Sequence, residues 1–143
     1  MTLQDSLNSL RQGISESNNF ISIAFEVDSN GNELFDEPKR DFVISSSFLK
    51  VFIYWEQFLE DVFAKYLCGE PAINGTNVVK FLNLSDRDHV LSVLIGTQKY
   101  VDWANHEIVR RLAKLYLQDG EPLNSNISAI ASELADLKTI RNA

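Results

Sequence analysis

FLKVFIYWEQFLEDVFAKYL, residues 48–67, is the stretch that decides the fold. It lies within a longer helical segment, about 40–68, which is followed by Gly69 and then Pro71, two residues that commonly end helices. Apolar side chains occupy almost the whole circumference of the predicted helix, so we expect it to be the central helix and to contact neighbours on several sides. Charged residues interrupt the apolar run, which indicates a core helix and not a membrane span.

Four further helices are predicted around this one. The first spans roughly residues 3–15, with leucines and an isoleucine recurring at three- and four-residue steps. Another covers about 86–95, and the next covers 106–117 with Asn105 as its N-cap. The last begins after Asn124-Ser125 and continues to the end of the sequence.

The segment 20–37 is less regular than its neighbours. Its alternating pattern and the Asn30-Gly31 pair favour a short hairpin, and an extension of the first helix followed by a loop fits almost as well. No internal repeat or linker divides the chain. The sequence therefore predicts an all-α fold, a single domain over 1–143, built as an antiparallel bundle of about five helices.

Composition excludes several classes of protein. Hydrophobic residues make up 45% of the chain and Cys68 is its one cysteine, so we expect a folded core, a buried structural thiol, no disulfide and a reducing cytoplasm. The N-terminus lacks the pattern of a signal peptide, and no apolar run is long enough for a membrane helix. A net charge of −7 argues against broad nucleic-acid affinity, and no DNA partner is expected.

Metal and cofactor sites are not predicted. Asp86 and His89 are the one carboxylate-to-histidine pair at the spacing that helical metal sites use, but Asp86 precedes a helix, where a capping role is ordinary. Asp28 begins an alternation of oxygen ligands that resembles a calcium loop. Glu33 and Lys39 occupy the positions where such a loop needs glycine and glutamate, so an EF-hand is not expected.

The C-terminal segment NISAIASELADLKTIRNA, residues 126–143, contains the strongest candidate for a functional residue. Its apolar positions form one helical stripe, made of Ile127, Ile130, Leu134 and Leu137. Arg141 falls near the middle of the same stripe. An arginine directed into an apolar surface is costly unless a fixed positive charge is needed there.

Two other pairs of charged residues are further candidates. Glu56 and Glu60 lie one turn apart on the long helix, where they form either a solvated stripe or the partners that orient a cation such as Arg141. Arg110 and Arg111 are the most basic local pair. They could contact RNA phosphates, although arginines on a surface helix are also ordinary.

Three segments carry a family resemblance. They are WEQFLE within residues 48–67, KYVDWANHEIVRRLAKLYL at 99–117, and LADLKTIRNA at 134–143. Together they resemble the HEPN superfamily, particularly its small prokaryotic branch from toxin–antitoxin and defence systems. The resemblance covers most of residues 45–143 and implies an α-helical bundle that forms a homodimer.

The resemblance also implies an activity. Many members are metal-independent endoribonucleases whose motif is an arginine, a polar residue and, a few residues later, a histidine. Arg141 matches the arginine and Asn142 the polar residue. The histidine would fall three to five residues after Ala143, so we expect the parent protein to continue; His89 and His106 precede the arginine. RNA is then the substrate and a small antitoxin protein a further partner.

Two alternatives stay open. The chain could be a non-catalytic HEPN-like module that binds a protein partner or a nucleotide, which the missing histidine and the negative charge favour. It could also be a generic helical interaction domain in which Arg141 is merely held in a salt bridge.

Overall fold

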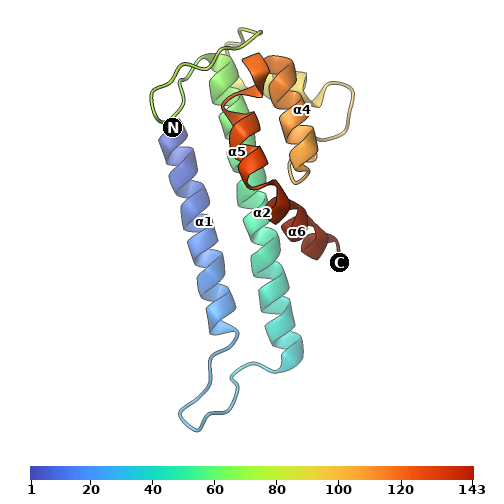
Figure 1. Cartoon of the computed structure of the whole chain (residues 1–143). Coiled ribbons are helices and arrows are strands. Elements are labelled where there is room, and N and C mark those ends of the chain that lie inside the picture. Colours follow the sequence, from blue (N-terminus) through green and yellow to red (C-terminus); the bar gives the residue numbers. More distant parts are fainter.

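The computed structural model describes residues 1–143. Its helices, in chain order, are α1 (Leu3–Ile23), α2 (Glu37–Cys68), α3 (Arg87–Ile95), α4 (His106–Tyr116), the 3-10 turn η1 (Gln118–Gly120), α5 (Leu123–Ala129) and α6 (Ala131–Asn142). No β-strand forms, so the prediction of an all-α bundle is confirmed. α1 and α2 form a long antiparallel pair, and the shorter helices gather around one end of it (Figure 1).

Local sequence signals set both ends of α2. Asp36 is its N-cap and accepts a hydrogen bond from the backbone N–H of Lys39 at 3.0 Å, and Pro38 stands in the first turn, where its missing N–H costs nothing. The helix ends at Gly69, whose φ of 101° lies in the left-handed region that glycine tolerates. The predicted end is therefore confirmed, and the start lies three residues earlier than the sequence indicated.

α1 is longer than predicted and packs through small side chains. Its buried face consists of Leu3, Ser6, Leu10, Gly13 and Ser17. A Cβ atom on Gly13 would lie 2.3 Å from the ring of Tyr54 on α2, so the glycine permits the close approach of the two helices. Ile14, which the predicted stripe placed in the core, is exposed. The apolar spacing identified the helix but only some positions of its contact face.

The connection between α1 and α2 combines the two predicted alternatives. α1 extends to Ile23, and the tip beyond it closes with a single antiparallel bridge between Val27 and Glu33. Asp28 organises the turn, because its Oδ1 accepts the backbone N–H groups of Asn30 at 2.8 Å and Asn32 at 2.9 Å. The tip is thus a hairpin-like turn without true strands.

The single C-terminal helix that the sequence predicted is two helices. Ile130 leaves the helical conformation, with φ −118° and ψ 16°, and α6 continues in a different direction from α5 (Figure 1). The break changes which positions face inward. Ile127 and Leu134 are buried, whereas Ile130 and Leu137 are exposed, so the expected continuous stripe is wrong at half of its positions. No glycine or proline marks the break.

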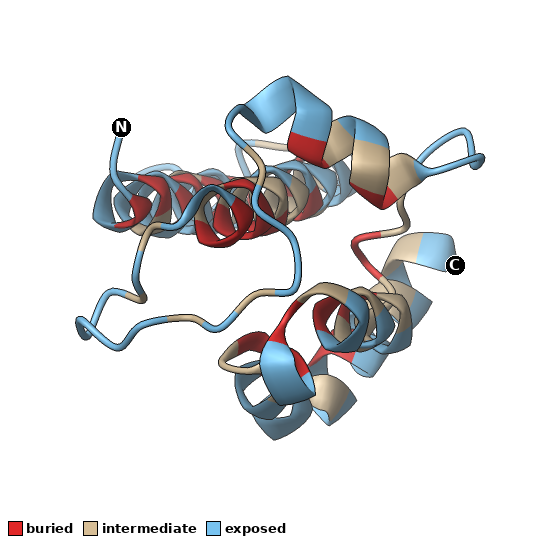
Figure 2. Cartoon of the chain, turned by 90° about the horizontal axis from the view of Figure 1, so that it is seen from above, coloured by how far each residue is buried: buried red, intermediate tan, exposed pale blue.

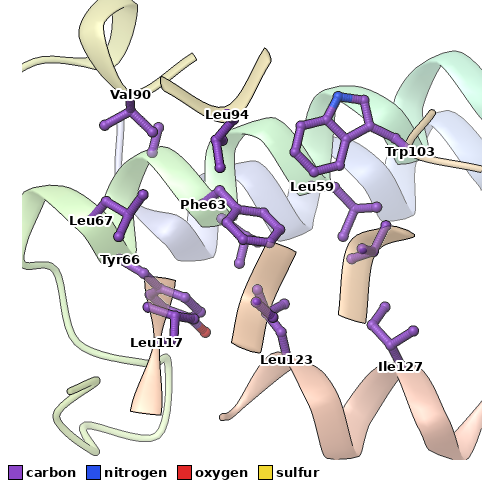
Figure 3. Packing of buried hydrophobic residues seen from close by; sticks show 14 of the residues in the cluster. Leu59, Phe63, Tyr66, Leu67, Val90, Leu94, Trp103, Leu117, Leu123 and Ile127 are labelled. Carbon is purple, nitrogen blue, oxygen red and sulfur yellow. The ribbon is translucent and has the colours of Figure 1, made fainter. Parts of the chain in front are cut away.

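The hydrophobic core lies around the C-terminal half of α2. Phe63 is fully buried at its centre, with Leu59 and Leu67 one turn to either side and residues of α3, α4 and α5 around them (Figure 3). The ring of Trp103, from the segment before α4, lies 5.4 Å from the Phe63 ring. By contrast, the connection 69–86 contributes no buried residue and is exposed or half-buried along its length (Figure 2).

The N-terminal half of α2 is different. Phe42 is 72% exposed and Leu49 is 49% exposed, and Ile53, at the midpoint of the helix, is 54% exposed. In Figure 1 α1 is the one helix that runs along this half, and α6 approaches it only near the middle of α2. The expectation that α2 is central and contacted on several sides therefore holds for its C-terminal half and is wrong for its N-terminal half.

Candidate functional site

Arg141 lies where α6 crosses the middle of α2. Its guanidinium carbon is 5.1 Å from the centre of the Phe52 ring, which is a cation–π contact. Its Nη1 is 3.9 Å from Glu56 Oε1, and its Nε donates to Asn142 Oδ1 at 3.1 Å. The side chain is 22% exposed. The arginine therefore has an aromatic surface beneath it and a carboxylate beside it, which offset the cost of withdrawing its charge from water.

Glu60, one turn after Glu56 on α2, is held on both of its oxygens. Oε1 accepts the indole N–H of Trp103 at 3.2 Å, and Oε2 lies 3.6 Å from Nη2 of Arg87. Trp103 is fixed in turn, because its carbonyl accepts the indole N–H of Trp55 at 3.3 Å. Glu56 accepts no side-chain hydrogen bond and has the long contact to Arg141 alone.

A cavity of about 430 Å³ opens beside these groups. Its charged lining residues are Glu56, Glu60, Lys99, Asp102 and Arg141. Its apolar and aromatic lining residues come from α3 and the segment that follows; they are Leu91, Leu94, Ile95, Tyr100, Val101 and Trp103. Such a mixed lining suits a ligand with flat apolar faces and polar edges.

The position of Glu56 raises the pKa of its carboxyl above the ordinary value. Burial is the largest cause; Arg141 opposes the shift, and the negative charges of Asp102 and Glu60 add to it. Asp102 has its own cation, since its Oδ2 lies 3.8 Å from Lys138 Nζ. The site is therefore a set of carboxylates, each beside a cation, in which Glu56 is the least well partnered.

The sequence singled out three of these residues. Arg141, Glu56 and Glu60 meet, and the contact between Arg141 and Glu56 agrees with the interpretation that a carboxylate orients the arginine. Asn142 is exposed and accepts from the Arg141 side chain.

The other basic candidates lie elsewhere. Arg110 is half-buried and donates through Nε to Asn124 Oδ1 at 3.0 Å, which joins α4 to α5, and Arg111 is exposed. Neither lines the cavity, and neither do His89 and His106. The basic pair is thus separate from the Arg141 site.

Sequence reasoning missed the contributions of Phe52, Trp103 and Asp102. Phe52 was one of many aromatic residues on α2, and nothing in its spacing distinguishes a cation partner from a core side chain. Trp103 and Asp102 belong to the segment between α3 and α4, where no periodicity predicts orientation. The indole N–H of a buried tryptophan does need an acceptor, and that requirement was the one available signal.

Cys68 contradicts its predicted environment. The thiol lies at the last residue of α2 and is exposed, because the helix emerges from the core there. The expectation of a buried structural cysteine is therefore wrong.

None of the helices combines the length and apolar composition needed to cross a membrane. Nowhere do three or more His, Cys, Asp or Glu side chains gather in an arrangement suited to a metal ion. No protein-family model matches the chain, and neither curated proteins nor solved structures show a match to it.

Proposed function

We propose that this chain is a module of a HEPN-type, metal-independent endoribonuclease in which Arg141 binds a phosphate of RNA. One observation carries the proposal: the motif arginine is held over Phe52 and beside Glu56 at the edge of a cavity. A guanidinium held in this way is ready to make charge-assisted hydrogen bonds to a phosphate. The family assignment and a role in a toxin–antitoxin or defence system rest on the sequence resemblance.

The proposed chemistry is transfer of the phosphate to the neighbouring 2′-oxygen. The 2′-hydroxyl loses its proton and its oxygen attacks phosphorus; the bond to the 5′-oxygen breaks, and that oxygen takes up a proton. A 2′,3′-cyclic phosphate and a free 5′-hydroxyl result. Arg141 stabilises the negative charge that develops on the phosphoryl oxygens. The proton acceptor in this scheme is the histidine of the motif, which the resemblance implies.

A homodimer belongs to the proposal as well. Phe42, Leu49 and Ile53 share one face of α2 with Glu56 and Glu60, since these positions span about 60° of the helix circumference. The exposed apolar stripe therefore leads directly to the Arg141 site. A second copy that covers the stripe would also bring its own Arg141 near the first. We expect light scattering to detect a dimer that Ile53→Glu dissociates while the circular dichroism spectrum stays helical.

A second function, a non-catalytic module that binds a protein partner, is favoured by the charge of the site. Glu56, Glu60 and Asp102 outnumber Arg141 and Lys99 on the cavity wall, and Arg141 already has Glu56 beside it. Such a surface suits a partner with exposed cations better than a polyanion. A small antitoxin protein with a basic surface would be a partner of this kind.

RNA cleavage in the presence of EDTA distinguishes the two functions. The assay uses a mixed RNA pool with the 143-residue chain and with the complete product of its reading frame. We expect the complete product to cut RNA and Arg141→Ala to lower the rate by about 10²–10³-fold. The matched control is Arg11→Ala, which removes an exposed arginine of α1. A dimeric complete product that leaves the pool intact would instead establish the binding module.

A further inference from the structure

We propose that the cavity beside Arg141 binds a guanine base, with Glu56 as the residue that selects it. The inference rests on the proposed function, because the base would belong to the nucleotide whose phosphate Arg141 contacts. It names the substrate more narrowly, as RNA with a guanosine at the cleaved or neighbouring position. Two features support the guanine site: the size and lining of the cavity, and the unused hydrogen-bonding capacity of Glu56.

The size and lining of the cavity suit a nucleobase. At about 430 Å³ it has room for a purine and its sugar, and its lining includes the apolar side chains of Leu91, Leu94 and Val101. Tyr100 also lines the cavity, is 71% exposed and does not belong to the hydrophobic core. Proteins that bind unpaired nucleotides stack the bases on exposed aromatic side chains of this kind.

Among the carboxylates, Glu56 has the free acceptors. Both oxygens of Glu60 are engaged, by Trp103 and by Arg87, and Asp102 lies beside Lys138. Glu56 has a single ion-pair contact, at 3.9 Å, and one oxygen with no partner. The Glu56 side chain is 40% exposed, so a ligand can reach this oxygen, and partial burial raises the pKa of the carboxyl.

Among the four RNA bases, guanine offers the hydrogen-bond donors that best match the Glu56 carboxylate. Its N1–H and N2–H groups are adjacent donors, and a carboxylate accepts both in the bidentate geometry that makes charge-assisted bonds strong. Adenine and cytosine each place an unprotonated ring nitrogen beside a single amino donor, and uracil flanks its one N–H with two carbonyls, all of which a carboxylate repels. Lys99, also on the cavity wall, can donate to the O6 and N7 acceptors of guanine.

The test is a titration with nucleosides followed by tryptophan fluorescence, since Trp103 lines the cavity and Trp55 contacts it. The probes are guanosine, adenosine, cytidine and uridine, which carry no phosphate and so report on the base site alone. We expect guanosine to bind about tenfold or more tightly than uridine, as one bidentate pair discriminates between bases. Glu56→Gln, which keeps the shape of the side chain, should abolish the preference, and Glu26→Gln on the exposed tip should retain it.

The pH dependence of guanosine binding provides a second readout. The groups that face Glu56 are Arg141 from α6, Glu60 from α2, and Lys99 and Asp102 from the segment before α4. Guanosine binding needs the ionised carboxylate, so it should weaken as the pH falls through the Glu56 pKa, which lies above the ordinary value. In Glu56→Gln this loss at acid pH should disappear.

Each outcome decides a different question. Three results would overturn the guanine site: equal binding of all four nucleosides, an unchanged preference in Glu56→Gln, or no binding of guanosine at millimolar concentration. The cleavage assay would then decide separately whether the protein cuts RNA. Selective guanosine binding by a complete product that cuts no RNA would retain the site and overturn the ribonuclease. Selective binding together with cleavage next to guanosine would support both.

Discussion

Both halves of α2 carry large apolar side chains, yet the two halves have opposite environments. In the C-terminal half, Leu59, Phe63 and Leu67 are fully buried beneath α3, α4 and α5. In the N-terminal half, Phe42 is 72% exposed and Leu49 is 49% exposed, and α1 is the one helix that runs alongside (Figure 1). Apolar composition thus marks the surface that can be buried, and the arrangement of the other helices decides how much of that surface a single chain buries. Large apolar side chains exposed together on one helix face are typical of an interaction surface.

The candidate site lies at the junction of the two halves. Phe52 is buried and belongs to the last turn before the core, Ile53 is exposed beside it, and Glu56 follows one turn after Phe52. α6 reaches this point because the chain turns at Ile130. A functional arginine placed here is held by a rigid core on one side and faces an open, apolar surface on the other.

The largest effect on stability should come from Phe63→Ala. Phe63 has no exposed surface and contacts the Trp103 ring, so its removal leaves a cavity at the centre of the core. We expect the free energy of unfolding to fall by about 3–5 kcal/mol, measured by urea denaturation. A loss below about 1 kcal/mol would mean that the core collapses around the missing ring and that the two halves of α2 differ less than their burial indicates.

Gly13→Ala should have the next largest effect, because it tests the contact between α1 and α2. Alanine in place of glycine usually stabilises a helix by about 1 kcal/mol. Here the new Cβ would meet the ring of Tyr54 at 2.3 Å, so we expect a loss of about 1–3 kcal/mol in the free energy of unfolding, measured by the same denaturation.

The matched control for this contact is the same substitution in a Tyr54→Ala background. Without the ring, Gly13→Ala should recover its ordinary stabilising sign, and the double-mutant cycle then reports the steric conflict alone. An alanine that stabilises the chain in both backgrounds would show that α1 and α2 are less closely packed than the structure indicates.

The parts of the fold that could be predicted are those that local sequence signals determine. The C-terminal end of α2 was predicted from Gly69 and the start of α4 from Asn105, because capping depends on a few neighbouring atoms. The start of α2 was predicted three residues too late, because the capping role of Asp36 was missed. The break at Ile130 was not predictable, since the segment 126–143 has an unbroken helical pattern and contacts with the rest of the chain decide its path. The small-residue face of α1 was missed for a related reason: hydrophobic spacing does not detect packing through Gly13 and Ser17.

The charged residues of the candidate site could be predicted from the sequence, but the side chains that surround them could not. An arginine on an apolar stripe requires a partner, and two glutamates one turn apart could supply it; that reasoning indicated Arg141 and Glu56. Which oxygens are free depends on Trp103, in the segment between α3 and α4, and on Arg87, the first residue of α3. Hydrogen-bonding details of this kind follow from the three-dimensional arrangement and leave no periodic trace in the sequence.

A smaller loss of stability is expected from a substitution at the N-cap of α3, one of the helices that cover the C-terminal half of α2. Asp86 caps α3, and its Oδ1 accepts the backbone N–H of His89 at 2.8 Å. Asp86→Ala should lower the free energy of unfolding by about 1 kcal/mol, whereas Asp86→Asn, which keeps the acceptor, should be nearly neutral. Equal losses in the two variants, measured by thermal denaturation, would assign the effect to charge and not to the cap.

Phe42→Ala should have the smallest effect on stability and completes the comparison. It makes the same chemical change as Phe63→Ala in the same helix, but at a side chain that is 72% exposed. At a protein concentration where the monomer predominates, we expect the free energy of unfolding to change by no more than about 0.5 kcal/mol. At higher concentration the same variant should dimerise more weakly, because the removed ring belongs to the proposed contact surface. A large loss in the monomer would place Phe42 in the core, and unchanged dimerisation would move the contact away from this stripe.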